Sequence, residues 1–291
     1  MTKINLLLDN SPLLFDGAMG TQLQKKGLPA GYPPELWNLE FPEIIKGIHS
    51  DYITAGSYII TTNSFGANRK RLEFSGYDSD VFQLNKAAAE LAKSAAKDKA
   101  LVAGDIGPTG LGLESFGELS EKEAAGIFYE QTAGLLAGGV DLILMETMLS
   151  SAEAIIAVKA AKEAGAETIG VSFTFEIINN RIFTPFGEAL ADILLKLEDT
   201  GIDFIGSNCG NGFENMKIIA AQLKEKTKLP VIVKPNAGMP ILTGNRYIYN
   251  ETKEMFAGFV KYAKSIGVEF IGGCCGTDFS YIEAAAEALK A

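Results

Sequence analysis

Short apolar, β-branched runs alternate along the chain with longer segments of helical periodicity. A turn rich in Gly, Asn, Thr or Asp follows most of the apolar runs. The runs predict eight strands, at residues 13–16, 58–62, 101–104, 141–146, 168–173, 203–206, 231–234 and 270–272. The periodic segments predict helices at residues 43–52, 81–96, 122–137, 151–164, 186–198, 215–224 and 253–264.

The apolar residues of these strands occupy neighbouring positions, which is typical of strands buried on both faces in a parallel sheet. Eight such strands separated by helices favour an α/β fold of the (β/α)₈ TIM-barrel class. We expect a single domain over residues 1–291, since no Pro/Gly/Ser-rich linker divides the chain. A doubly wound open sheet is the alternative architecture.

The composition narrows the classes of partner. The 291 residues carry a formal net charge of -10, whereas nucleic acids and anionic membranes attract clustered Lys and Arg. No apolar run approaches the roughly 20 residues of a membrane helix, and the N-terminus has no cleavage site of an export signal. We therefore expect a cytoplasmic protein with reduced thiols, and neither a nucleic-acid nor a membrane partner.

The three cysteines of the chain follow predicted strands. Cys209 lies after the sixth strand, and Cys274 and Cys275 lie after the eighth. In a barrel the carboxyl ends of the strands meet at one face, so the three thiols should converge there. Three thiolates with one open position are typical of catalytic zinc, and the glycines around the pair allow both side chains to face one ion.

Two other interpretations of these residues stay open. Free cysteines are often inert and buried, and this applies best to Cys209 taken alone. A Gly-rich loop late in a barrel can also bind phosphate through its backbone N–H groups. That second interpretation explains the glycines at 272, 273 and 276 and leaves the cysteines without a role.

Seven segments in order along the chain resemble the homocysteine S-methyltransferase family. The similarity is greatest to the homocysteine-binding domain of cobalamin-dependent methionine synthases. The segments are FDGAMGTQLQ (15–24), TTNSFGANRKRL (61–72), GDIGPTG (104–110), ETMLSSAEA (146–154), SNC (207–209), KPNAGMP (234–240) and GGCCGT (272–277).

The resemblance implies a (β/α)₈ barrel whose Zn²⁺ is held by the three cysteines. It also implies that Asp16, Gly17 and Glu146 bind the amino-acid end of homocysteine, with Glu146 facing its ammonium group. In the methionine-synthase branch, an asparagine that matches Asn236 occupies the fourth zinc position before the substrate arrives. Asn236 also fits a turn after a proline.

Asn63 and Asn208 lie in family motifs and are expected to line the pocket. The segment GNGFENM after Cys209 departs from the family pattern, which leaves the preferred thiol open: homocysteine or a related small thiol. The methyl group would come from methylcobalamin on a separate corrinoid protein or from a small sulfonium or ammonium donor.

We therefore expect an S-methyltransferase that ionises the homocysteine thiol on zinc and forms methionine. A non-catalytic subunit that only binds zinc and the thiol is the main alternative. A barrel lyase or aldolase would need a Schiff-base lysine, for which Lys234 is the candidate. The single histidine, His49, lies in a predicted helix and is expected to be a surface or packing residue.

Overall fold

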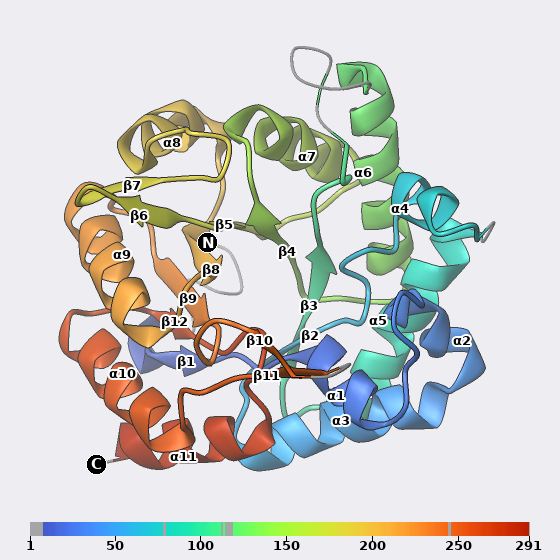
Figure 1. The fold of residues 1–291 in the computed structure, drawn as a ribbon. Helices are drawn as coiled ribbons and strands as arrows, with labels where there is room; N and C mark the ends of the chain where they lie inside the picture. Colours follow the sequence, from blue (N-terminus) through green and yellow to red (C-terminus); the bar gives the residue numbers. More distant parts are fainter. Residues whose placement is uncertain (1–7, 78–79, 112, 114–118, 244–245, 291) are drawn as a thin grey trace.

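Parallel strands form the centre of the molecule, and helices surround them (Figure 1). The structure is a computed structural model that describes residues 8–77, 80–111, 113, 119–243 and 246–290. Within these residues, the strands of the central sheet are β1 (Leu13–Leu14), β2 (Ile59–Thr61), β3 (Leu101–Ile106), β4 (Leu142–Met148), β5 (Ile169–Phe173), β8 (Phe204–Cys209), β9 (Val231–Pro235) and β12 (Phe270–Ile271).

The eight strands close into a barrel. Neighbouring strands are parallel, in the order β1-β12-β9-β8-β5-β4-β3-β2. A parallel bridge between Phe15 and Ile59 then joins the two ends of the sheet. The prediction of a single-domain (β/α)₈ barrel is confirmed, and the open-sheet alternative is wrong.

The predicted helices are present with small shifts at their ends. The largest difference is at residues 186–198, where the helix starts only at Leu190 because Thr184–Gly187 form a turn with Gly187 at φ +83°. The described helices are α1 (Met19–Lys25), α2 (Trp37–Glu40), α3 (Pro42–Ala55), α4 (Arg69–Phe74), α5 (Val81–Ala96), α6 (Glu121–Ala137), α7 (Ser151–Glu163), α8 (Leu190–Leu197), α9 (Phe213–Lys226), α10 (Lys253–Ser265) and α11 (Phe279–Lys290), with 3₁₀ turns η1 (Leu8–Asn10), η2 (Pro34–Leu36) and η3 (Glu198–Thr200). None of these described helices is both long and apolar enough to cross a lipid bilayer.

The strands are buried on both faces, as their apolar runs predict. Residues that alternate along each strand face the barrel interior, where Phe15, Phe204 and Phe270 pack on one another. The other residues of each strand pack against the surrounding helices. Toward the carboxyl ends, the inward positions change from apolar to polar, and this change creates a polar layer above an apolar floor.

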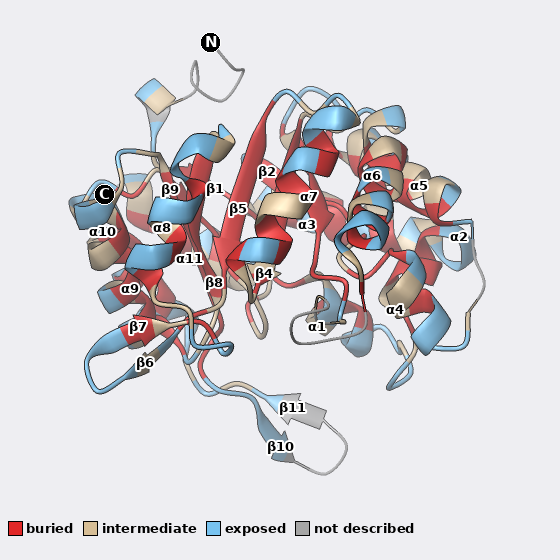
Figure 2. Cartoon of the chain, turned by 90° about the horizontal axis from the view of Figure 1, so that it is seen from above, coloured by how far each residue is buried: buried red, intermediate tan, exposed pale blue. Residues whose placement is uncertain are grey.

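Two antiparallel hairpins follow strands of the barrel. They are β6 (Glu176–Ile178) with β7 (Arg181–Phe183), and β10 (Ile241–Thr243) with β11 (Arg246–Ile248). Figure 2 shows both hairpins at the same end of the barrel, and β10–β11 projects beyond it. The strand and helix patterns of the sequence do not predict these hairpins, which lie at the end of the barrel where the polar layer opens.

Candidate functional site

The structure brings the three cysteines together at the carboxyl end of the barrel. Cys209 is the last residue of β8, and Cys274 and Cys275 lie in the loop between β12 and α11. The Sγ atoms of Cys209 and Cys274 lie 3.2 Å apart, and the three sulfurs all lie within 4.8 Å of one another. All three cysteines are free and half-buried.

Backbone contacts fix the loop that carries the cysteine pair. The Cys274 N–H donates to the carbonyl of Pro235 at 2.8 Å, and the Ala237 N–H donates to the carbonyl of Cys275 at 2.9 Å. Gly276 has φ +85°, and a Cβ there would lie 2.3 Å from the ring of Tyr249. Glycine is therefore needed at this turn, which lets two adjacent cysteines face Cys209.

The same loop is poorly suited to phosphate. Backbone N–H groups can bind a phosphate only if they are free to point at it. Here the loop amides donate to protein acceptors: those of Gly272, Gly273, Cys274, Gly276 and Thr277. The phosphate interpretation of the glycines is therefore wrong for this conformation of the loop.

A cavity of about 360 Å³ opens beside the three sulfurs. Of the residues that the resemblance assigns to the substrate, Gly17, Asn63 and Glu146 line the cavity with the cysteines. Its wall also contains Lys234 and Asp105. A cavity of this size, with charged and hydroxyl side chains beside apolar ones on its wall, is suited to a small amphiphilic molecule.

The other residues that the resemblance assigns to the substrate or to the metal are not part of the cavity wall described here. Asn208 is fully buried, and its Oδ1 accepts hydrogen bonds from Ser172 Oγ and the Thr147 N–H, both at 2.7 Å. Its Nδ2 lies 3.9 Å from the sulfur of Cys274. These contacts join Asn208 to β4, β5 and Cys274, and its expected place at the pocket stays a prediction.

Asn63 and Asn236 each use the amide nitrogen in a backbone contact. Asn63 Nδ2 donates to the carbonyl of Pro34 at 2.8 Å and thereby holds the N-terminal segment over the barrel mouth. Asn236 Nδ2 donates to the carbonyl of Gly210 at 2.9 Å. The Oδ1 atom of Asn236 is buried without a partner in the described residues, so it remains available as an oxygen ligand.

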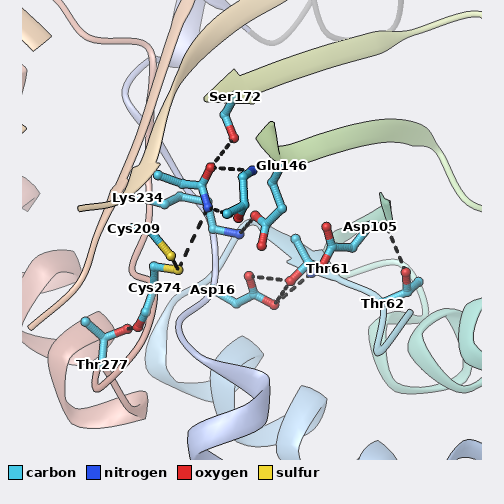
Figure 3. A network of polar contacts seen from close by, with 12 residues as sticks. Asp16, Thr61, Thr62, Asp105, Glu146, Ser172, Cys209, Lys234, Cys274 and Thr277 are labelled. Carbon is cyan, nitrogen blue, oxygen red and sulfur yellow. Dashed lines mark hydrogen bonds and ion pairs between the residues drawn. The ribbon is translucent and has the colours of Figure 1, made fainter. Parts of the chain in front are cut away.

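Charged side chains form a second group inside the polar layer (Figure 3). Lys234 Nζ lies 2.8 Å from Glu146 Oε2 in a buried ion pair. Asp16 accepts hydrogen bonds from the N–H of Thr61 at 2.7 Å and from its hydroxyl at 3.0 Å. Asp105 points toward the same group from β3. Three carboxylates therefore surround one lysine.

Burial and these neighbours shift the acid–base behaviour of the group. Burial raises the pKa of Asp16 to about 6, although Lys234 opposes the shift. Burial also raises the pKa values of Glu146 and Asp105. For Lys234, burial lowers the pKa, but the attraction of Glu146, Asp16 and Asp105 outweighs it and raises the pKa above its usual value.

The state of Lys234 argues against a Schiff-base enzyme. A lysine that forms a Schiff base must be a free amine, and such lysines have lowered pKa values. Lys234 instead remains an ammonium group that is paired with Glu146. The lyase or aldolase alternative therefore lacks its nucleophile.

The three thiols share hydrogen bonds, which separate their pKa values. Hydrogen bonds from Cys209 and Cys274 hold the pKa of Cys275 well below its usual range. The contact with Cys274 raises the pKa of Cys209. The cluster thus stabilises a thiolate, which is the form of cysteine that binds metals.

Comparison with known proteins identifies the family. The family model described as homocysteine S-methyltransferase matches residues 13–289. The chain belongs to the homocysteine S-methyltransferase family. Membership confirms the resemblance drawn from the seven sequence segments.

Individual members of the homocysteine S-methyltransferase family show how far the similarity extends. Methionine synthase from Mycobacterium leprae is 30% identical over 298 residues, which cover 95% of this chain and 24% of that protein. Methionine synthase from Mycobacterium tuberculosis is 30% identical over 97% of this chain and 25% of its own length. The chain therefore spans about a quarter of the length of these curated relatives.

A solved structure matches over nearly its whole length. The metallated form of the homocysteine methyltransferase MmuM from Escherichia coli has a TM-score of 0.80 and 25% sequence identity. The match covers 98% of this chain and 99% of MmuM. The two chains are thus comparable in extent.

Proposed function

We propose that the chain is a zinc-dependent S-methyltransferase that transfers a methyl group to the thiol of homocysteine and forms methionine. The proposed zinc ligands are Cys209, Cys274 and Cys275. The convergence of three thiols from two distant parts of the chain beside one cavity is the observation that carries the proposal.

The donor set fits zinc. Thiolates favour zinc over magnesium and calcium, which prefer oxygen ligands. Among the described residues, the three cysteines form a group of potential ligands whose donor atoms lie close enough together to hold one ion. Asn236 Oδ1, buried without a partner, is our candidate for the fourth position before substrate binds. Zinc bound here would lower the pKa of an incoming thiol, so that the thiol is ionised at neutral pH.

The polar layer would hold the amino-acid end of the substrate. We propose that Gly17 and Asn63 shape this part of the cavity and that Asp16 and Glu146 supply negative charge to it. A Cβ at Gly17 would lie 2.9 Å from the carbonyl oxygen of Thr277, so glycine keeps this wall open. The Lys234–Glu146 pair fixes the Glu146 carboxylate in one orientation.

The methyl donor would enter from the mouth of the barrel. We propose methylcobalamin on a partner corrinoid protein, since the curated relatives are methionine synthases. A small sulfonium or ammonium donor is the second candidate, because the chain also matches 99% of the MmuM chain, which is of similar extent. Residues 1–291 would act as one homocysteine-binding unit with either donor, in the cytoplasm.

The first prediction tests the ligand set and the reaction together. Zinc-loaded protein, incubated with L-homocysteine and either methylcobalamin or a sulfonium donor, should form methionine. Cys209→Ser should lose most of its zinc and lower the rate by about 100-fold or more, because loss of a direct ligand should exceed the effect of a supporting residue. Zinc content and methionine are both measured.

Ser207→Ala is the matched control. Ser207 lies two residues before Cys209 on the same strand, is buried, and its hydroxyl has no hydrogen-bond partner in the described residues. This variant should keep both zinc and activity. A Cys209→Ser protein with full zinc and full methylation would refute the site, and zinc binding without product from any donor would indicate a thiol-binding subunit instead.

A further inference from the structure

Asp105 is a buried carboxylate in the cavity wall, and one of its two oxygens has no hydrogen-bond partner among the described residues. It lies on β3 and is 6% exposed. Its backbone is fixed on both sides: its N–H donates to Thr62 Oγ1 at 2.9 Å, and its carbonyl accepts from Ser64 Oγ at 2.7 Å. The Oδ1 atom of its side chain is buried and has no hydrogen-bond partner among the described residues.

The neighbouring acids are satisfied by the protein itself. Glu146 has Lys234, and Asp16 has the N–H and hydroxyl of Thr61. Figure 3 shows the side chain of Asp105 directed toward this group, where the only cation drawn is already paired with Glu146. The group therefore has a surplus of negative charge on the side of Asp105.

A buried carboxylate that lies outside the cavity wall, Glu153, is satisfied by the protein itself. Glu153 accepts hydrogen bonds from the N–H and the hydroxyl of Thr109, at 2.8 and 2.6 Å. Glu35, which lines the cavity as Asp105 does, also has a donor, the N–H of Gly66 at 2.6 Å. Burying a carboxylate without such a donor is costly. Asp105 Oδ1 has no such donor in the part of the chain that the structure describes, so a structural role does not explain its presence.

We propose that Asp105 receives the α-ammonium group of the substrate and so selects amino-acid thiols over simple thiols. An ammonium group supplies both the hydrogen-bond donors that Oδ1 lacks and the positive charge that three carboxylates around one lysine lack. Glu146 then keeps its ion pair with Lys234 when the substrate binds. The inference rests on the proposed function, because it assigns the ammonium group of homocysteine to a residue of that same site.

The second prediction compares two thiols that differ only in the amino group. L-homocysteine and 4-sulfanylbutanoate share the thiol, the chain length and the carboxylate. Asp105→Asn should lower kcat/KM for homocysteine by about 30-fold or more, as expected when one partner of a buried charged contact is removed. The same variant should change kcat/KM for 4-sulfanylbutanoate by less than about threefold, since that thiol has no ammonium group to lose.

We expect the Asp105→Asn protein to fold as stably as the wild type. The unpartnered carboxylate makes no hydrogen bond through Oδ1 that Asn would break, so Asp105→Asn should unfold at the same temperature as the wild type or higher. Glu153→Gln is the matched control, because Glu153 is a buried carboxylate that is absent from the cavity wall. It should leave the preference for homocysteine unchanged. Asp105→Asn with the wild-type preference would overturn the inference.

A binding measurement separates this inference from the proposed function. L-methionine and 4-(methylsulfanyl)butanoate are titrated into wild-type and Asp105→Asn protein by calorimetry, which requires neither turnover nor zinc. The wild type should prefer L-methionine, and the variant should lose that preference. If the wild type methylates neither thiol, the proposed function fails, and this titration still decides the role of Asp105: equal preference in both proteins would overturn it.

Discussion

At the scale of single residues, His49 shows how burial alone can set a chemical property. His49 lies on α3, fully buried, and neither ring nitrogen has a hydrogen-bond partner in the described residues. Burial lowers its pKa to about 4, because a charged imidazolium would lose its hydration. The expectation of a packing residue is therefore confirmed, and His49 takes no part in the site.

The third prediction concerns stability against acid. The unfolded chain binds a proton at His49 near pH 6.5, whereas the folded chain binds it only near pH 4. Stability contributed by the neutral, buried form is therefore complete above pH 6.5 and is lost as the pH falls toward 4, by about 3 kcal/mol. His49→Leu should remove this part of the pH dependence.

The measurement is urea unfolding of both proteins between pH 7 and pH 4. The difference in unfolding free energy between wild type and His49→Leu isolates this group, because the chain has a single histidine. A difference that stays constant across the range would contradict the account.

Some single residues of the site follow from the sequence, and others do not. Cys209, Cys274 and Cys275 can be predicted because strand ends meet at one face of a barrel. The partner of Lys234 cannot be predicted, because Glu146 lies 88 residues away and only the closed barrel brings the two together. Asp105 lies at a strand end with a visible signal, a carboxylate after an apolar run, but its lack of a partner is a property of the fold.

At the scale of elements, close approach between strands determines where glycine is required. Gly206 lies in β8, and a Cβ there would lie 1.7 Å from the carbonyl oxygen of Ile232 on β9. Strand β9 also carries Lys234 and Pro235, so a shift of its backbone would displace residues of the site. By contrast, a Cβ at Gly258 in α10 would meet no atom within 4 Å.

The fourth prediction is that alanine at these two glycines has opposite effects. Gly206→Ala should lower the unfolding free energy by about 3 kcal/mol or more, because backbone must move in a packed interior. Gly258→Ala should raise it by about 0.5–1 kcal/mol, because alanine favours the helix and restricts the unfolded chain. Urea denaturation measures both, and equal stability of Gly206→Ala and wild type would contradict the packing described here.

Elements with a uniform apolar pattern could be predicted from the sequence, and hairpins could not. The eight barrel strands are buried on both faces, so their pattern is unmistakable. The hairpin β6–β7 is partly exposed, and its signal is instead the turn: Asn179 and Asn180 have φ +50° and +60°. Two consecutive residues with positive φ are typical of a type I′ hairpin turn. In the sequence, the Asn-Asn pair between two short apolar runs is therefore the feature that indicates this hairpin.

At the scale of the whole molecule, closure of the barrel brings the ends of separate strands together and so forms the site. The bridge between Phe15 and Ile59 closes the sheet, and closure brings β3, β4 and β9 into contact with one cavity. Strand count alone did not distinguish a barrel from an open sheet. The identity of the methyl donor depends on a second molecule, so no pattern within this chain determines it.

The fifth prediction tests the central claim, that three cysteine sulfurs hold one zinc ion. Zinc K-edge X-ray absorption is recorded on protein loaded with one equivalent of zinc. The account predicts three sulfur neighbours at about 2.3 Å and one lighter atom. The zinc that the Cys209→Ser protein retains should have two sulfur neighbours. A wild-type spectrum with fewer than three sulfur neighbours, or one that Cys209→Ser leaves unchanged, would contradict the account.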